Sequence, residues 1–240
     1  MQIKKLESID STNTWVNQNE SLLEDTALVY CVEQTAGRGQ RGNSWESEPG
    51  KNITASLLIH PQVFAAYRQF QLSEAMALAI VDYLRSKDVE AKVKWPNDIY
   101  VGDKKICGIL VEHVVTGKNI SRTIVGFGLN INQEKFISDA PNPVSLTQLT
   151  SIEYNLETEI EEVAKFIARR FDRVALEDLH SEFLSKLWRH DGEIHGFKDN
   201  KKGELIQARI MDVDPNGTLY LMTDKGEMRD YAFKEIEFLL

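Results

Sequence analysis

The sequence from position 34 to position 45 reads Gln34-Thr35-Ala36-Gly37-Arg38-Gly39-Gln40-Arg41-Gly42-Asn43-Ser44-Trp45, and we term this stretch the glycine loop. It interleaves glycines with arginines directly after an apolar run. Glycine adopts positive φ and lets the backbone approach a ligand closely, while arginine adds a fixed positive charge. This combination favours a loop that closes on an anionic, phosphate-bearing molecule. Taken alone, the stretch fits a solvated surface loop equally well.

Apolar runs of strand length flank the glycine loop and recur after it. Residues 27–33 and 53–59 read as buried strands on either side, so the loop is a long strand-to-strand excursion. Residues 91–95, 98–101, 105–115 and 121–132 predict four more strands, with a hairpin turn at Gly102-Asp103.

Helical patterns accompany these strands. Asp10-Ser11-Thr12-Asn13 offers N-cap residues for a first helix, and apolar residues spaced by three and four mark one face of a helix over residues 66–85. Residues 157–190 favour one or two further helices, with a break near residues 176–178. Together these elements predict an α+β fold, a mixed and mostly antiparallel sheet backed by helices.

The last 50 residues have a different sequence pattern. Short β-rich runs at 205–213, 218–222 and 227–233 are separated by turn signals, with no helical pattern between them. Such a run of short strands favours a small barrel. We therefore expect a larger domain over residues 1–190 and a small domain over residues 191–240.

Composition limits the classes of function. The formal net charge is −9, which argues against a protein that coats nucleic acid. Cys31 and Cys107 lie in apolar, strand-like surroundings and are expected to be reduced core residues. Neither an apolar leader nor a run of 18 uncharged apolar residues is found, so we expect a soluble, cytoplasmic protein.

Three further blocks follow the glycine loop. They read Lys94-Trp95-Pro96-Asn97-Asp98, then Lys105-Ile106-Cys107-Gly108-Ile109-Leu110-Val111-Glu112, then Gly126-Phe127-Gly128-Leu129-Asn130-Ile131-Asn132. In this order the four blocks resemble the catalytic domain of biotin protein ligases. The resemblance covers residues 1 to about 190 and implies a sheet similar to that of class II aminoacyl-tRNA synthetases. It also implies an SH3-like cap, which residues 191–240 match only in size and texture.

The resemblance implies a two-step reaction. Such ligases activate biotin with ATP as biotinyl-5′-AMP and transfer it to a lysine of a biotin carboxyl carrier protein domain. Because the acceptor amine attacks the acyl carbon directly, the enzyme supplies positioning and charge neutralisation rather than a nucleophile. Mg²⁺ on the phosphates completes the expected set, with its protein ligands unknown. Accordingly, the five histidines form no triad that we can defend.

Catalytic roles are implied for three cations. Lys105 matches the family lysine that lies beside the biotin carboxyl oxygen and the phosphate, and Arg38 and Arg41 fall on the ligand loop. From the residues alone, the favoured interpretation of Lys105 is a solvated lysine at a hairpin edge. Lys104 is its natural control, because neighbouring strand residues point to opposite faces.

Binding roles are implied for a larger set. Ser11, Thr12 and Asn13 match biotin contacts but also suit helix capping, and Gln34 reads alternatively as a polar strand end. Glycines in strands allow close backbone approach to a ligand or mark β-bulges. Trp45 is expected to stack on adenine or to anchor the core, and Asp98 to face phosphate or Mg²⁺ or to cap a turn. The full implied binding set is Ser11, Thr12, Asn13, Gln34, Arg38, Gly39, Gln40, Trp45, Lys94, Asn97, Asp98, Gly108, Gly126, Gly128 and Asn130.

Gln40 departs from the family pattern, which has a third arginine at this position. The missing charge could weaken retention of the acyl adenylate and let it react with bystander amines. Alternatively, Arg38 and Arg41, with Lys51 nearby, supply enough charge, or Gln40 hydrogen-bonds the same oxygen.

Two other functions stay open at this point. A lipoate-type acyl ligase shares the fold, although its arginine and triple-glycine signature differs from the loop found here. A noncatalytic biotin-binding regulator is the second; only about ten residues precede Ser11, so we expect no N-terminal DNA-binding domain and no DNA binding. The carrier domain is expected to dock along a sheet edge such as residues 105–115, which could also pair two copies, so the chain is a monomer or a homodimer.

Overall fold

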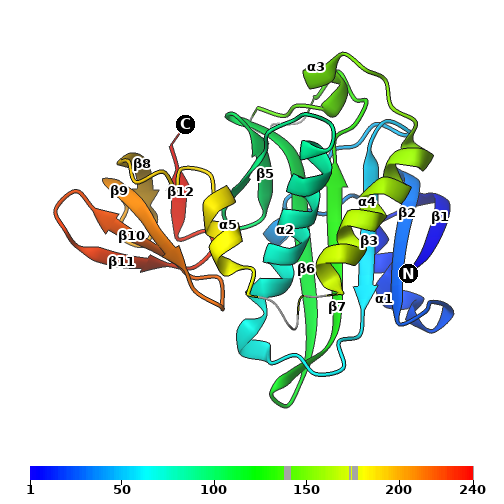
Figure 1. Ribbon diagram of the computed structural model, residues 1–240, viewed down its shortest axis with the longest axis horizontal. Coiled ribbons are helices and arrows are strands. Elements are labelled where there is room, and N and C mark those ends of the chain that lie inside the picture. Colours follow the sequence, from blue (N-terminus) through cyan, green and yellow to red (C-terminus); the bar gives the residue numbers. More distant parts are fainter. Residues whose placement is uncertain (138–141, 173, 175–177, 240) are drawn as a thin grey trace.

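The computed structural model describes residues 1–137, 142–172, 174 and 178–239, except for the side chain of Arg41. Its larger sheet has seven strands in the order β1-β2-β3-β7-β6-β5-β4 (Figure 1). β1 runs parallel to β2, and all other neighbours in this sheet are antiparallel. The strands are β1 Gln2–Ile9, β2 Thr26–Gln34, β3 Ile53–Ile59, β4 Lys92–Lys94, β5 Asp98–Val101, β6 Lys104–Thr116 and β7 Asn119–Leu129.

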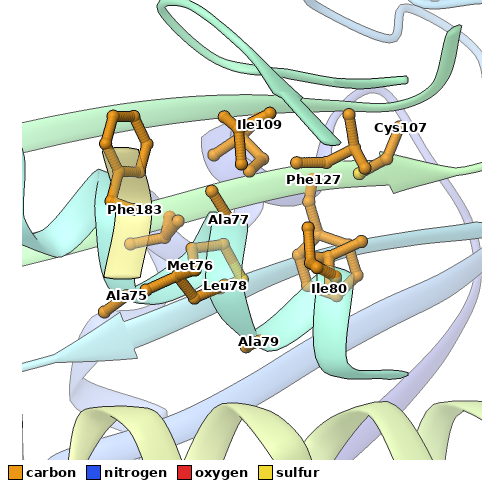
Figure 2. Packing of buried hydrophobic residues seen from close by; sticks show 14 of the residues in the cluster. Ala75, Met76, Ala77, Leu78, Ala79, Ile80, Cys107, Ile109, Phe127 and Phe183 are labelled. Atoms are coloured by element: carbon orange, nitrogen blue, oxygen red, sulfur yellow. The ribbon is translucent and has the colours of Figure 1, made fainter. Parts of the chain in front are cut away.

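Two long helices cover one face of this sheet. α2 (Phe70–Arg85) and α4 (Leu156–Phe171) lie side by side in front of it in Figure 1. Figure 2 shows α2 residues from Ala75 to Ile80 packed near Cys107, Ile109 and Phe127 of the sheet and Phe183 of α5 (His180–Lys186). This buried apolar surface is the main core.

The alternation of side chains along β6 and β7 shows which residues lie on the opposite face of the larger sheet. Successive side chains of a strand point to opposite sides of the sheet. Cys107 and Ile109 point toward α2, so Gly108 between them faces away from it. Phe127 likewise leaves Gly126 and Gly128 on that far face. The far face is covered in part by α1 (Thr12–Gln18), whose Val16 belongs to a second, smaller core cluster. Because Gly108, Gly126 and Gly128 have no side chains, they leave room on this face beside α1.

The C-terminal strands form a separate five-stranded antiparallel sheet in the order β11-β10-β9-β8-β12. Its strands are β8 His195–Asp199, β9 Glu204–Val213, β10 Leu219–Thr223, β11 Met228–Tyr231 and β12 Ile236–Phe238. No pairing joins β11 to β12 within the described residues, so the expected small barrel is present as an open sheet. Trp95 attaches it to the larger sheet: its indole Nε1 donates to Gly217 O (3.0 Å) and its ring packs on Phe233.

The α+β fold expected from the sequence is confirmed, with differences in detail. β1 was missed because its apolar residues Ile3, Leu6 and Ile9 recur every third position, which is not the strand period. β8, β12 and α3 (Leu146–Thr150) were also missed. Residues 176 and 177 of the expected helix break lie outside the described residues. Short 3₁₀ turns occur at Glu20–Leu22, Gln40–Gly42 and Ala66–Arg68.

The expectation that residues 105–115 form a sheet edge is wrong for the first half of that run. β5 pairs with β6 as far as Gly108, so only the later residues of β6 extend beyond β5. Among the described helices, none combines the length and the apolar character needed to span a bilayer.

Candidate active site

A cavity of about 1100 Å³ lies on the far face of the larger sheet. Gly108, Gly126 and Gly128 form its floor, since a Cβ on Gly126 would overlap Asn13 and one on Gly128 would overlap Trp45. The glycine loop, the start of α1, the turn after β4 and residues of β12 form its walls. Both sheets therefore contribute to one cavity.

A β-bulge gives the cavity its central lysine. The pairing of β5 with β6 runs Asp98 to Gly108, Ile99 to Cys107 and then Tyr100 to Lys105, which leaves one extra residue in β6. In a regular strand, residues three apart point to opposite faces, and the bulge removes this opposition. The Lys105 Nζ accordingly lies 3.3 Å from the point where a Gly108 Cβ would stand.

Lys105 is held by partners on both sides of the cavity. Its Nζ lies 2.7 Å from Asp98 Oδ1 and 5.6 Å from the centroid of the Trp45 ring. Its backbone N–H donates to Asn142 O (2.9 Å), which fixes the strand beneath it. Lys105 is thus partly buried rather than a solvated hairpin lysine, whereas Lys104 is exposed.

Neutral polar groups line the end of the cavity at α1. Gln34 Oε1 accepts hydrogen bonds from the backbone N–H (2.8 Å) and the hydroxyl (3.1 Å) of Thr12. The Ser56 hydroxyl lies 2.7 Å from Thr12 Oγ1 and 2.5 Å from Asn13 Oδ1. Because Thr12, Asn13 and Ser56 are buried, these bonds hold the side chains in fixed orientations. This end suits a neutral ligand group that both donates and accepts hydrogen bonds.

Glu112 connects this neutral end to the glycine loop. Its Oε2 accepts from Asn13 Nδ2 (2.8 Å), and its carboxylate pairs with Arg38 Nη2 (3.1 Å). The Arg38 and Glu112 side chains are 46% and 43% exposed, so water screens the pair. Arg38 is therefore held at the cavity by a weak contact.

Trp45 lies on the glycine floor. The positions that a Cβ would take on Gly108 and Gly128 fall against its indole ring, and its Nε1 is buried without a hydrogen-bond partner among the described residues. The ring does not anchor the main core, which lies across the sheet. Its face is presented on the cavity side, next to the Lys105 ammonium.

The block from Lys94 to Asp98 forms the opposite wall. The Trp95–Pro96 peptide is cis, and Asn97 then donates its Nδ2 to Ile109 O (2.7 Å) on β6. Burial lowers the pKa of Lys94, with the neighbouring Lys105 charge acting in the same direction and Asp98 against it. Asp98 is held by Lys105 rather than capping a turn.

The structure brings most of the predicted site residues into this one cavity. Ser11 is the N-cap residue of α1, but its side chain makes no capping hydrogen bond. Asn130 does not line the cavity; it is buried and donates to Val144 O (3.1 Å). The Arg41 side chain lies outside the described part. The residues that line the cavity are Ser11, Thr12, Asn13, Gln34, Arg38, Gly39, Gln40, Trp45, Lys94, Asn97, Asp98, Lys105, Gly108, Gly126 and Gly128.

Sequence reasoning missed Ser56 and Glu112, which contact side chains that line the cavity, and Phe238, which lines it. Ser56 was read as part of an apolar strand, although a hydroxyl inside such a strand is itself a signal. Glu112 was quoted in a block without a role, and Phe238 lies in a strand that was not predicted. Lys51 was expected near the loop charges, but it lines a separate hollow with Glu48 and Glu134.

The buried cysteines and the acidic side chains limit the kinds of chemistry that this cavity can carry out. Cys31 and Cys107 are free and buried, and burial raises the pKa of both thiols, so neither is a nucleophile for this cavity. Among the described residues, no group of three or more His, Cys, Asp or Glu side chains could hold a metal ion.

A glycine floor, one polar neutral end and cations along the rest suit a ligand that carries an uncharged ring at one end and anionic groups at the other. The α+β fold and this site define a class of protein that holds a ligand of this kind on the far face of a mixed sheet. Comparison with known families supports this class: the chain belongs to the Biotin/lipoate A/B protein ligase family, whose model matches residues 6–130.

Individual relatives agree with the family. The chain is 30% identical over 236 residues to "Bifunctional ligase/repressor BirA" of Salmonella typhimurium, covering 95% of this chain and 71% of that protein. It is 26% identical over 215 residues to the protein of the same name from Bacillus spizizenii, covering 85% of this chain and 64% of the relative. The chain thus spans less than two thirds of the length of this Bacillus relative.

Solved structures share the fold. A "Biotin protein ligase from Aquifex aeolicus in complex with biotin and ATP" superposes with a TM-score of 0.79 at 22% identity, covering 98% of this chain and 97% of that chain. At this identity the likeness establishes the fold of both sheets together.

Proposed function

We propose that this chain is an ATP-dependent biotin protein ligase that forms biotinyl-5′-AMP and transfers biotin to a lysine of a carrier domain. One observation carries the proposal. A single cavity joins a neutral hydrogen-bonding end at Thr12, Asn13 and Gln34 to a cationic part at Lys105 and Arg38, over a floor of glycine.

In the first step, a biotin carboxylate oxygen attacks the α-phosphorus of ATP, and the bond to diphosphate breaks. Two anions must approach each other, so fixed cations lower the barrier. Lys105 would lie between the carboxylate and the α-phosphate, and Arg38 would exchange Glu112 for the phosphate. The neutral end would hold the ureido ring so that the carboxylate is aimed correctly.

In the second step, the amine of the acceptor lysine attacks the acyl carbon and AMP leaves. The amine proton passes to solvent, and no enzyme nucleophile takes part. Trp45 would stack on adenine, because its ring face already lies on the cavity side.

Mg²⁺ fits this cavity as a companion of ATP rather than as a resident ion. It prefers to keep several waters and to take one or two carboxylates together with substrate phosphates. Asp98 is the carboxylate in the cavity beside Lys105 that matches this mode. The ion would neutralise phosphate charge that Lys105 and Arg38 do not reach.

The acceptor would be a biotin carboxyl carrier protein domain of a carboxylase. The part of β6 beyond β5 offers an edge for it, and the exposed Val114 and Val115 lie there. The same edge would serve a homodimer. We also propose a cytoplasmic location, division at about residue 190 into catalytic and C-terminal domains, and no DNA binding by an acidic chain of net charge −9.

The test is a reaction of the purified chain with ATP, Mg²⁺, biotin and a purified carrier domain, followed by intact mass spectrometry. We expect the mass of one biotinyl group on the carrier, dependent on ATP. Replacing biotin by lipoate separates the related acyl ligase, since this proposal expects no lipoyl product. A lipoylated carrier, or an unmodified one with a folded chain, would overturn the proposal.

A further inference from the structure

The ammonium of Lys94 lies among three aromatic rings. Its Nζ is 4.7 Å from the centroid of Tyr100, 5.8 Å from that of Trp188 and 5.6 Å from that of Phe238. It also donates a hydrogen bond to the Tyr100 hydroxyl (3.1 Å). Cations within about 6 Å of ring faces are stabilised electrostatically. We term Tyr100, Trp188 and Phe238 the aromatic cage.

The cage is assembled from distant parts of the chain. Tyr100 belongs to β5 of the larger sheet, Trp188 follows α5, and Phe238 lies on β12 of the C-terminal sheet. The rings contact one another, with centroids 5.4 Å apart for Tyr100 and Trp188 and 5.8 Å apart for Trp188 and Phe238. Tyr100 is 1% and Trp188 6% exposed, so their positions are fixed by packing.

Lys94 differs from Lys105 in how its charge is balanced. Lys105 is paired with Asp98, whereas no carboxylate lies within ion-pair distance of Lys94 in the described part of the chain. The charged or titratable groups that face Lys94 are Asp98, Lys105, Arg189 and Tyr100. A cation balanced by rings keeps its charge available for an anion, and both Lys94 and Phe238 line the cavity.

We propose that Phe238 and Trp188 are positioning residues that hold the Lys94 ammonium toward the phosphates of the bound nucleotide. The C-terminal sheet thereby takes part in nucleotide binding through a lysine of the larger sheet. The identity of the ligand rests on the proposed function, while the placement of Lys94 by the cage does not.

A packing role alone predicts a different outcome. If Phe238 only joined the two sheets, its loss would lower stability and affect all substrates equally. If it positions Lys94, its loss acts on ATP and spares biotin, whose proposed seat is at the other end of the cavity. The two substrates therefore separate the explanations.

The experiment compares Phe238→Leu with Phe238→Tyr, which retains the ring, and with Ile206→Ala, which removes buried apolar surface from the same sheet outside the cage. For Phe238→Leu we expect a KM for ATP raised about tenfold, with the KM for biotin changed less than about twofold. We expect Phe238→Tyr to keep the KM for ATP near the wild-type value, and Ile206→Ala to keep the KM for ATP and the KM for biotin near theirs. Equal effects on both substrates, or no effect on ATP, would overturn the inference.

A second readout does not need ligase activity. Carbon-13 methylation of lysines reports the pKa of Lys94 by NMR, with Lys94→Arg assigning its signal. Burial holds this pKa below the ordinary lysine value, so the Lys94 charge is lost at lower pH than that of an exposed lysine as pH rises. Because leucine keeps the site apolar but removes a ring face that stabilises the ammonium, we expect Phe238→Leu to lower the Lys94 pKa further and Ile206→Ala to leave it unchanged.

This readout separates the two possible failures. A wild-type protein that forms no biotinyl-5′-AMP contradicts the proposed function, yet the Lys94 pKa still tests the cage. An unshifted pKa in Phe238→Leu contradicts the cage whatever the activity.

Discussion

The cavity holds its cations in two different ways at its two ends. At the glycine loop, Arg38 is paired with Glu112, and both side chains are close to half exposed. At the aromatic cage, Lys94 is enclosed by rings from both sheets and has lost much of its hydration. Lys105 lies between them, paired with Asp98 and less exposed than Arg38.

Arg38 can exchange its partner for another anion, whereas Lys94 is held in a fixed position. An exposed ion pair contributes about 0–1 kcal/mol, so a phosphate can replace Glu112 at Arg38 with little loss. The cage is fixed by packing, so under the proposed function it would already be in place when a nucleotide binds. We therefore expect the loop end to tune retention of the intermediate and the cage end to set nucleotide affinity.

The largest effect is expected where the two ends meet. Lys105→Ala removes the cation that would neutralise carboxylate and phosphate together, so we expect the rate of biotinyl-5′-AMP formation to fall about 10²–10³-fold. Rapid-quench assays at saturating biotin and ATP measure this rate. Lys104→Ala is the matched control, since the exposed neighbour should change the rate very little. Comparable losses in both variants would remove Lys105 from its role.

A smaller effect is expected at the floor near α1. In Gly126→Ala the new Cβ would overlap the Asn13 amide, which would lose its contacts with Ser56 and Glu112. Crowding of this kind costs about 1–3 kcal/mol, so we expect the KM for biotin to rise roughly tenfold or more, with ATP affected less.

The matched control for this change is Gly196→Ala, whose Cβ would meet its nearest neighbour at an ordinary 3.4 Å. Steady-state kinetics for both substrates check the pair. An unchanged KM for biotin in Gly126→Ala would show that the neutral end is not its seat.

A modest effect is expected from breaking the loop pair. Glu112→Gln keeps a hydrogen-bond acceptor for Asn13 but removes the charge opposite Arg38. Because the pair is exposed, we expect the free energy of unfolding to change by no more than about 1 kcal/mol. Denaturant titration measures stability, and adenylate dissociation is measured alongside. We expect slower adenylate release, as Arg38 then has one competitor fewer; faster release would contradict exchange at Arg38.

The smallest effect is expected at the position that departs from the family pattern. Gln40 lines the cavity with Arg38 and Lys105, so charge is already supplied there. We expect Gln40→Arg to leave biotinylation of bystander amines nearly unchanged, as judged by mass spectrometry of an added non-substrate protein. A marked fall in that labelling would show that a third loop arginine is what retains the intermediate.

Sequence reasoning found the parts of the site that depend on residue type. Glycines in strands and the arginines of the glycine loop predicted a floor and cations, and the family resemblance selected Lys105. The apolar period predicted a helix over residues 66–85, which includes all of α2. The bulge that turns Lys105 toward Gly108 was not predictable, because it depends on how β5 registers against β6. Glu112 and Phe238 were missed for the same reason: each acquires its role from a partner far away in the chain.

The most direct measurement is a crystal structure of the chain with a non-hydrolysable analogue of biotinyl-5′-AMP. The account predicts the ureido ring beside Asn13 and Gln34, the phosphate between Lys105 and Arg38, and Arg38 released from Glu112. An analogue bound away from the glycine floor, or bound with the Arg38–Glu112 pair intact and Lys105 out of reach of the phosphate, would contradict it.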